Sequence, residues 1–274
     1  MPLLPADSEF LCRLVRDRSG IVLGEDNARL LESRLLPLAQ VTGFESIEEL
    51  AARLRFEPTG PLAQQVVEVM IANEAGFFRG VSAFECLRRV VFPTMVAQRA
   101  TECRLDAWCA NAANGYEPYS LAIALREYAP QMANWQIRMV ATDISPDALN
   151  RAREARYSQL EVERGLPAPL LATWCTKEDI DWRVNDDIRR IIQFRELNLL
   201  DSAWPLTGSF DIIFLRYALT YVDIDAKRYI LGKCRRLLRP DGFLFLGANE
   251  TTVNIDDGFM RVDPSGCHRL KPTT

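Results

Sequence analysis

Residues 105–118 read LDAWCANAANGYEP, and this stretch says more about the architecture than any other part of the chain. Its first part, 105–110, is a short run of mostly apolar and small side chains, which is typical of a buried strand. Residues 111–115 are small or turn-forming and end at Gly115. Pro118 suits the first turn of a helix, because its missing N–H would have no partner there. The stretch therefore predicts a strand, a tight turn and a helix in succession.

The same alternation continues downstream. A second apolar run, 137–142, ends at Asp143, and Ser145-Pro146 begins another helix. Further strands are expected at 191–194, 210–215 and 243–247, with a helix over 225–238 that Pro240-Asp-Gly242 stops. Strands that alternate with helices predict an α/β fold with a mostly parallel, doubly wound sheet. Prolines and charges interrupt the alternation over 157–190, where we expect an insertion.

Residues 8–72 instead show helical periodicity and almost no strand signal. Two apolar stripes have helical spacing: Phe10, Leu11, Leu14 and Val15, and then Leu30, Leu31, Leu35 and Leu38. Asp26 or Asn27 is expected to cap the second helix, and Ser46 with Glu49 fits a capping box for a third. The sequence thus predicts an all-helical domain over 1–72, a linker and helix over 73–103, and the α/β domain over 104–274.

Composition excludes several classes of function. The formal net charge is −4 and no basic stretch is longer than the Arg235-Arg236 pair, so no nucleic-acid partner is expected. No apolar run approaches the ~18–20 residues of a membrane span, and the N-terminus lacks the features of a secretion signal. We therefore expect a cytoplasmic protein that does not insert into membranes. The seven cysteines form no C-x-x-C pair and the one histidine, His268, is expected at the surface or a sheet edge, so no metal site is expected.

Three polar or turn features follow successive strands of the predicted sheet: the Gly115 turn, Asp143 and Asn198. The carboxyl ends of parallel strands meet at one edge, where open α/β sheets bind ligands. An acidic side chain after the second strand can accept both hydroxyls of a ribose. The turn lacks the G-x-G-x-x-G pattern of dinucleotide sites, which disfavours a nicotinamide-dependent oxidoreductase. An adenosine cofactor without phosphates fits better, and S-adenosyl-L-methionine is the common one.

At these residues the sequence resembles the CheR family of chemotaxis receptor methyltransferases, over nearly the whole chain. Asn73-Glu-Ala-Gly-Phe-Phe-Arg79 resembles the family's N-E-T-x-F-F-R linker, and Asn114-Gly-Tyr-Glu-Pro-Tyr-Ser120 resembles its G-E/Q-E-P-Y-S turn. The later matches are Ala141-Thr-Asp-Ile144, Phe194-Arg-Glu-Leu-Asn-Leu-Leu200, Phe214-Leu-Arg-Tyr-Ala-Leu-Thr-Tyr221, Pro240-Asp-Gly-Phe-Leu-Phe-Leu-Gly247 and Glu250-Thr. Because these motifs occur in the family's order, the resemblance is specific.

The resemblance implies a helical domain that meets the receptor and a class I methyltransferase domain with a small β-subdomain inserted at 157–190. It implies transfer of a methyl group from S-adenosyl-L-methionine to glutamate side chains of chemoreceptors, leaving S-adenosyl-L-homocysteine and serving sensory adaptation. The implied catalytic pair is Arg79 and Tyr221. The implied cofactor contacts are Asn73, Ala75, Arg79, Glu117, Asp143, Asn198, Leu199, Arg216 and Tyr217. Residues 176–182 lack the glycine-rich loop of tethered members, which implies receptor helices recognised without a C-terminal peptide tether.

This chemistry suits a chain with one histidine. A glutamate carboxylate is already ionised at neutral pH, so its attack on a sulfonium methyl needs neither a base nor a metal. Several family positions nevertheless differ: Ala75 replaces a threonine, Tyr116 an acid or amide, and Tyr217 an asparagine. These changes leave an alternative open. In it, the chain is a weakened or inactive CheR-like protein that acts as a cofactor-binding or protein-interaction module in receptor signalling.

Overall fold

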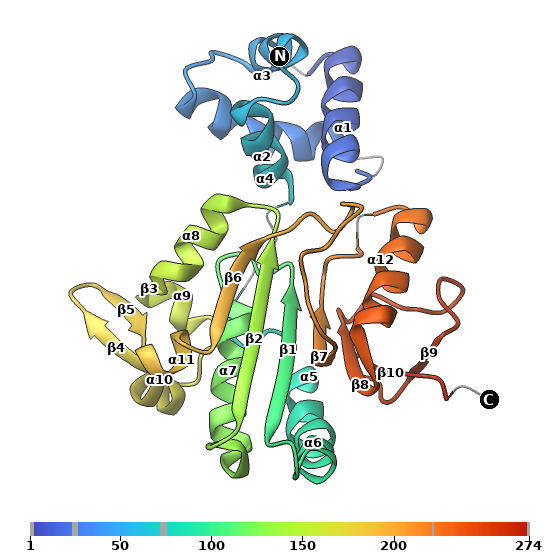
Figure 1. Ribbon diagram of the computed structural model, residues 1–274. Helices are drawn as coiled ribbons and strands as arrows, with labels where there is room; N and C mark the ends of the chain where they lie inside the picture. The colour runs from blue at the N-terminus through green and yellow to red at the C-terminus, as the bar shows by residue number, and fades with distance from the viewer. Residues whose placement is uncertain (1–2, 24–26, 72–75, 221, 273–274) are drawn as a thin grey trace. The chain divides into compact units, whose positions relative to one another are not determined.

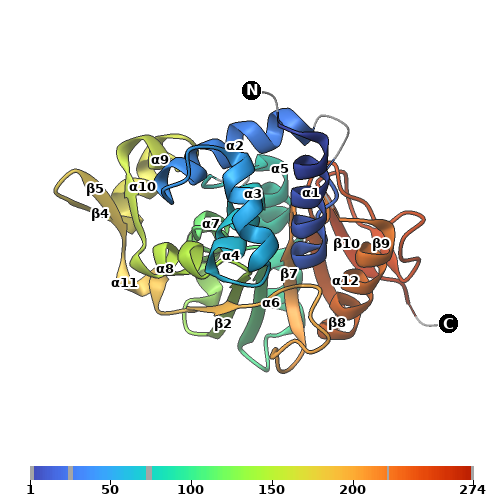
Figure 2. The ribbon, with the colours of Figure 1, turned by 90° about the horizontal axis from the view of Figure 1, so that it is seen from above.

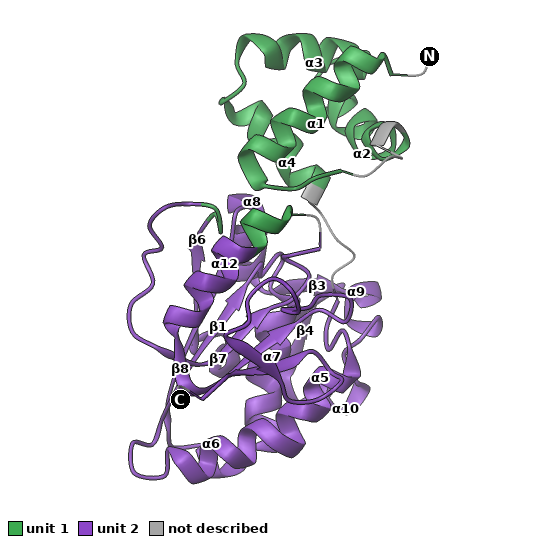
Figure 3. Ribbon diagram, turned by 90° about the vertical axis from the view of Figure 1, so that its right-hand side faces the viewer, with its two compact units in different colours: residues 1–73, 198–200, 221–227 green, residues 74–197, 201–220, 228–274 purple. Residues whose placement is uncertain are grey.

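The computed structural model describes residues 3–23, 27–71, 76–220 and 222–272. The chain divides into two compact units, coloured separately in Figure 3. Residues 1–73, 198–200 and 221–227 form the first unit, and residues 74–197, 201–220 and 228–274 form the second. In the described part of the chain, no helix is long and apolar enough to cross a lipid bilayer.

The first unit is helical. Its helices are α1 (Pro5–Ser19), α2 (Asn27–Val41), α3 (Ile47–Phe56) and α4 (Pro61–Ile71). The two predicted apolar stripes supply much of the core: Leu11, Leu14, Val15, Leu31 and Leu35 are buried, and Phe10, Leu30 and Leu38 pack against them. Burying one face of each helix is what stabilises so small a bundle, because isolated helices of this length are marginal in water.

The predicted capping box of α3 is only half formed. The Ser46 side chain accepts a hydrogen bond from the Glu49 N–H at 3.3 Å. The Glu49 carboxylate, however, accepts from the N–H of Glu45 at 2.9 Å. The glutamate therefore reaches one residue further back than the capping box requires. Asp26, one of the two caps proposed for α2, lies outside the described residues.

The second unit is built on a mixed sheet in the order β6-β2-β1-β7-β8-β10-β9 (Figure 1). Its parallel strands are β1 (Arg104–Ala110), β2 (Gln136–Asp143), β6 (Ile192–Glu196), β7 (Phe210–Leu215) and β8 (Leu238–Leu246). From β1 the chain first extends the sheet through β2 on one side and later through β7 on the other. The strand order therefore reverses between β1 and β7, the position at which such sheets bind ligands.

Helices connect these strands and precede them. The main connections are α7 (Tyr116–Tyr128) after β1, α8 (Pro146–Glu154) after β2 and α12 (Ile224–Leu237) before β8. The predicted start of α8 is confirmed, because Ser145 caps it by accepting from the Ala148 N–H at 3.1 Å. Before β1 lies a continuous helical stretch of α5 (Val81–Cys86), the π-helical turn η1 (Leu87–Val91) and α6 (Phe92–Gln98).

The helix expected over 225–238 ends at Leu237, close to the prediction, but the last parallel strand begins before 243, where it was expected. Strand β8 begins at Leu238, directly after the helix, and contains Pro240-Asp-Gly242. Phe210 of β7 pairs with Leu238, whereas Ile212 pairs with Phe243, so the strand bulges at this tripeptide. Proline and glycine are tolerated inside a strand at such a bulge.

The C-terminal hairpin was not predicted. Strands β9 (Phe259–Arg261) and β10 (Cys267–Leu270) run antiparallel and extend the sheet beyond β8. His268 therefore lies in an inner strand, is only 3% exposed, and has its Nδ1 2.9 Å from the Gly266 carbonyl oxygen. Burial lowers its pKa. The expectation that His268 lies at the surface or a sheet edge was wrong, because the two short strands of the hairpin, β9 and the β10 that contains it, carried too weak a pattern to detect.

Residues 156–189 form a small substructure beside β6, on the opposite side of the main sheet from the β9–β10 hairpin (Figures 1 and 2). Its strands β3 (Arg156–Ser158), β5 (Asp181–Val184) and β4 (Cys175–Glu178) make an antiparallel sheet in that order. Its helices are α9 (Gln159–Glu163), α10 (Ala168–Trp174) and α11 (Asp186–Arg189).

Candidate functional site

The turn between β1 and α7 carries three left-handed residues at alternate positions. Asn111, Ala113 and Gly115 have φ values of 61°, 45° and 91°. At Gly115 a Cβ would lie only 3.0 Å from the hydroxyl of Tyr157, so no larger residue fits without displacing a neighbour. Left-handed backbone costs an alanine roughly 1–2 kcal/mol, and such strain is held only where surrounding contacts enforce it.

Asp143, at the end of β2, makes the contacts that hold this strained turn. Its Oδ2 accepts from the Ala113 N–H at 2.7 Å, and its Oδ1 accepts from the Ser145 N–H at 3.0 Å. The residue is only 5% exposed, and burial raises the pKa of its carboxyl while the amide hydrogen bonds oppose that rise. The Ile144 amide is a third backbone partner of this carboxylate, which leaves about one of its roughly four lone-pair positions for a ligand. Asp143 therefore fixes the turn and can still accept a hydrogen bond from a ligand.

A buried ion pair joins β7 to α7. Arg216 follows the last residue of β7 and is 3% exposed, and its Nη1 contacts the Oε1 of Glu117 in the first turn of α7. The Nη2 of Arg216 donates to the carbonyl oxygen of Arg79 at 2.8 Å. Burial raises the pKa of Glu117, and Arg216 opposes that rise. The Arg216 Nε is also buried but has no hydrogen-bond partner among the described residues, which leaves one strong donor for a ligand.

Tyr217 brings Arg79 into the same site. The guanidinium carbon of Arg79 lies 4.0 Å from the centroid of the Tyr217 ring, and that of Arg216 lies 5.1 Å from it. A cation over an aromatic face is attracted by the quadrupole of the ring. Tyr217 is itself left-handed, with a φ of 59°. Its half-buried ring thus orients the exposed Arg79 and is partly covered by it.

Glu250 holds this strained segment, and the sequence did not suggest that role. Its carboxylate accepts from the N–H groups of Tyr217 at 2.8 Å, Leu219 at 2.7 Å and Gly247 at 2.6 Å. It therefore ties the loop after β7 to the end of β8. The available signals were the match of Glu250-Thr to a family motif and the position of this acid three residues after the glycine that ends the last predicted strand.

Tyr116 lies away from this cluster. Its ring packs edge-on against Phe77 at 5.2 Å and lies 5.0 Å from Tyr157, and only 6% of the residue is exposed. Its hydroxyl donates to Glu161 of α9. Burial and this hydrogen bond raise the pKa of Tyr116 to about 12. Tyr116 is one of the departures from the family pattern, and its ring is packed between the main sheet domain and the small substructure.

The remaining predicted site residues divide into two groups. Asn198 and Leu199 belong to the first unit. There, Asn198 donates to the Arg18 carbonyl oxygen at 2.9 Å and accepts from the Leu200 N–H at 2.9 Å. Asn73, Ala75 and Tyr221 lie outside the described residues. Within the second unit the structure brings together Arg79, Glu117, Asp143, Arg216 and Tyr217 at the carboxyl ends of β1, β2 and β7.

These groups suit a ligand that combines a nucleoside with an amino acid. Asp143 offers a carboxylate lone pair to a ribose hydroxyl, and the buried Arg216–Glu117 pair offers one group of each sign to an α-carboxylate and an α-ammonium. The free Nε–H of Arg216 is a further donor for a carboxylate. S-adenosylmethionine has all three of these features.

Comparison with known proteins agrees with this assignment. Residues 6–70 match the model of the CheR methyltransferase all-alpha domain, and residues 73–265 match that of its SAM binding domain. A chemotaxis protein methyltransferase of Pseudomonas aeruginosa is 36% identical over 95% of both chains. One from Pseudomonas putida is 37% identical over 90% of both, and one from Vibrio cholerae is 34% identical over 97% of this chain and 98% of its own.

The matches confirm the resemblance, the predicted fold class and S-adenosylmethionine as the cofactor. The α/β domain has the class I methyltransferase type of sheet, and an all-helical domain precedes it. On these matches and this architecture, the chain belongs to the CheR methyltransferase family.

Proposed function

We propose that this protein transfers a methyl group from S-adenosylmethionine to glutamate side chains on the cytoplasmic helices of chemoreceptors, forming methyl esters. Relatives that carry the name chemotaxis protein methyltransferase support the receptor as substrate. The observation that carries the proposal is the position of Arg79. Its guanidinium rests on Tyr217 beside the buried Arg216–Glu117 pair, so a cation for the substrate carboxylate adjoins the groups suited to the cofactor.

The residues that would hold the cofactor are Asp143 for the ribose, and Arg216 with Glu117 for the methionyl group. When bound, the cofactor supplies an electrophilic methyl group on a sulfonium centre. The amides of Ala113 and Ser145 keep the Asp143 carboxylate in one orientation, so little reorganisation is needed on binding. Asn73, Ala75, Arg79, Asn198, Leu199 and Tyr217 complete the proposed set of cofactor contacts.

Arg79 is the proposed anchor for the attacking glutamate. A planar guanidinium pairs with a carboxylate through two parallel hydrogen bonds, and stacking on Tyr217 limits the rotation of that plane. The substrate carboxylate is already ionised at neutral pH, so the protein has to orient it rather than deprotonate it. Tyr221 is the second proposed catalytic residue, acting as a hydrogen-bond donor or packing partner beside the transferred methyl group.

We also propose that receptors are recognised without a C-terminal peptide tether. Only Asp179 and Ile180 connect β4 to β5 in the small sheet, which leaves no long loop to hold an added peptide. Receptors with and without their last residues should therefore be methylated at equal rates. A rate that depends on those residues would contradict this point.

The test is transfer of tritiated methyl groups from labelled cofactor to receptor-containing membranes. We expect incorporation that is released as methanol in mild alkali, because carboxylate methyl esters are alkali-labile. An Arg79→Ala variant should lose the transfer while it still binds S-adenosylhomocysteine. Alkali-stable incorporation by the wild type would contradict glutamate as the acceptor.

The alternative, a cofactor-binding or protein-interaction module without turnover, has one observation in its favour. The Tyr217 ring covers one face of the Arg79 guanidinium. The same assay separates the two functions. Binding of S-adenosylhomocysteine with no methyl incorporation into any receptor would favour the module.

A further inference from the structure

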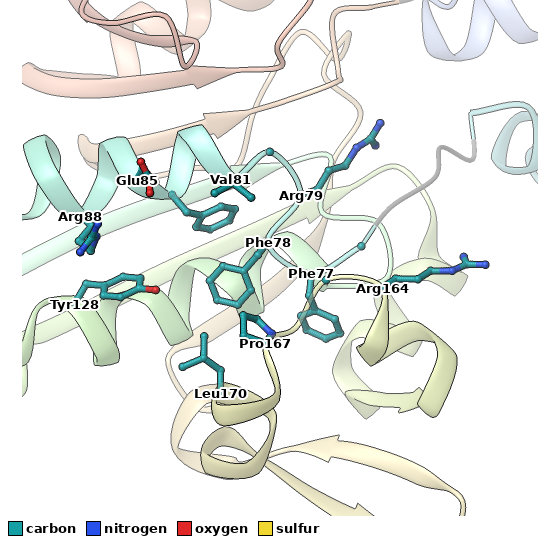
Figure 4. Close-up of a pocket in the computed structure, with 14 residues that line it drawn as sticks. Phe77, Phe78, Arg79, Val81, Glu85, Arg88, Tyr128, Arg164, Pro167 and Leu170 are labelled. Carbon is teal, nitrogen blue, oxygen red and sulfur yellow. The ribbon is translucent and has the colours of Figure 1, made fainter.

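A groove of about 820 Å³ lies within the second unit, next to Arg79 (Figure 4). One wall is formed by α5 and η1, and the other by the segment 164–170 that leads into α10. Phe77 and Phe78 lie between the walls. Figure 4 shows Arg79 and Arg164 at one end of the groove and Arg88 with Tyr128 at the other.

The segment 164–170 is packed closely against Phe77, which lies between the walls. A Cβ at Gly165 would lie 2.0 Å from the carbonyl oxygen of Phe77, so the two backbones meet where no side chain fits. The N–H of Phe78, between the two walls, donates to the Ser120 hydroxyl of α7 at 2.8 Å. The groove is therefore built into the fold and does not depend on the conformation of a loose side chain.

The lining combines exposed apolar surface with positive charge. Val81 is 70% exposed and Tyr128 is 41% exposed, so two of the lining side chains offer apolar surface to solvent. Arg88 and Arg164 are exposed and have no carboxylate partner among the described residues, and Arg79 adds a third cation. The one lining acid, Glu85, pairs with Arg89 at 3.7 Å. The groove is thus basic in a chain whose net charge is −4.

We infer that this groove docks the substrate segment itself, an acidic amphipathic helix of the receptor that carries the glutamates to be methylated. The inference rests on the proposed function, and it assigns receptor binding to the second unit rather than to the helical domain alone. An amphipathic helix would set its apolar stripe on Val81 and Phe78, with its acids beside Arg88 and Arg164. Because the groove ends at Arg79, a helix lying in it continues directly to the proposed catalytic residue.

The test compares two double charge reversals in the full-length protein. Arg88→Glu with Arg164→Glu alters the groove. Lys271→Glu with Arg236→Glu is the matched control, because both cations are exposed, lie outside the groove and have no carboxylate partner among the described residues. Val81→Asp is a second groove variant, at an exposed position where folding should be unaffected. Each protein is titrated with a purified cytoplasmic fragment of a chemoreceptor from the same genome, and separately with S-adenosylhomocysteine.

We expect the groove variants to bind the receptor fragment at least about tenfold more weakly than the wild type, since reversal places like charges opposite each other. Their affinity for S-adenosylhomocysteine should stay within about twofold, and the control pair should match the wild type in both titrations. Equal fragment binding by groove variants and wild type would overturn the inference. So would equal weakening in the control, failure of the wild type to bind the fragment, or a groove-dependent preference for anionic lipid vesicles over the fragment.

These outcomes are separate from those that bear on the proposed function. If the wild type binds the fragment through the groove but transfers no methyl group, the docking site is supported and the proposed activity is contradicted. A wild type that methylates receptors as fast as its groove variants do would keep the activity and remove the docking site.

Discussion

Buried arginines lie at both ends of the parallel strands of the main sheet, but their surroundings differ. At the amino end, Arg99 is 5% exposed and its Nε donates to the fully buried Asp211 at 2.8 Å. Its Nη1 donates to Asp241 at 2.8 Å. Asp211 also accepts from the N–H of Asp106 at 2.8 Å, and Asp106 pairs with Arg104 at 2.9 Å.

At the carboxyl end, Arg216 contacts Glu117 but keeps a buried Nε without a partner among the described residues. Two neighbouring residues, Ala113 and Tyr217, are held in left-handed conformations. The satisfied network at the amino end serves the stability of the sheet. The incomplete and strained one at the carboxyl end is what a binding site requires, because its remaining donors and lone pairs are left for a ligand.

The largest effect should come from breaking the amino end. Arg99→Ala leaves Asp211 buried without its main partner, so we expect a loss of about 3–5 kcal/mol of unfolding free energy. Urea unfolding followed by circular dichroism measures it. The folded fraction should bind S-adenosylhomocysteine as the wild type does. A variant as stable as the wild type would show that the network is not structural.

Removing Arg79 at the carboxyl end should instead lower activity and leave stability almost unchanged. Arg79→Ala should lower kcat/KM for receptor methylation by about 10²–10³-fold, as loss of a donor that orients and stabilises reacting charge does elsewhere. Arg79 is exposed, so the midpoint of urea unfolding should barely move. Full activity in this variant would remove Arg79 from the mechanism.

The two ends of the sheet should also respond differently to acidification. Burial raises the pKa of Asp143, so the carboxylate proposed to bind the ribose is lost at a higher pH than for an ordinary aspartate. The hydrogen bond from Arg99 lowers the pKa of Asp241. The ion pair of Arg99 with Asp241 therefore stabilises the fold fully above the pKa that Asp241 has in the unfolded chain, and this stability is lost as the pH falls through the lowered pKa of the folded state. We therefore expect that, as pH falls, cofactor binding weakens before the protein unfolds.

Calorimetric titrations with S-adenosylhomocysteine and thermal melts over the same pH series would show whether binding weakens first. Cofactor binding and folding that fail together at one pH would contradict the assigned directions of the two pKa shifts.

The smallest effect concerns Tyr217. Tyr217→Asn removes a cation–π contact worth about 0.5–1 kcal/mol, so methyl transfer should fall by roughly two- to fivefold. Asparagine tolerates left-handed backbone better than tyrosine, so stability should be kept or slightly raised. Tyr217→Phe keeps the ring and should retain the activity. If both variants behave alike in kcat and KM, the ring does not position Arg79.

The sequence was sufficient to locate most elements of the main sheet, and the Gly115 turn and Asp143 at its carboxyl edge, whereas Asn198 lies in the first unit. Strands such as 210–215 and the helix start at Ser145 depend on local patterns of polarity and capping, which a single sequence carries. The Gly115 turn and Asp143 were predicted to meet because the topology of a parallel sheet brings strand ends together.

Other features depended on contacts that no local pattern contains. Pro240-Asp-Gly242 has the composition of a turn and became a bulge only because β7 was available to pair with the flanking residues. The direction of the Tyr116 ring depends on Phe77 and Tyr157, which are distant in sequence. The hydrogen bonds from the loop after β7 to Glu250, and the ion pairs of Arg99, likewise join residues that are distant in sequence.

The most direct test of the contrast between the two ends is a calorimetric titration of S-adenosylhomocysteine into the wild type and Asp143→Asn. Asparagine keeps the shape of the side chain but loses the charge, and a hydrogen bond to a charged group is worth about 1.5–3 kcal/mol. We expect saturable one-to-one binding by the wild type that is at least about tenfold weaker in the variant. No binding by the wild type, or equal binding by both proteins, would contradict the assignment of the cofactor to this edge of the sheet.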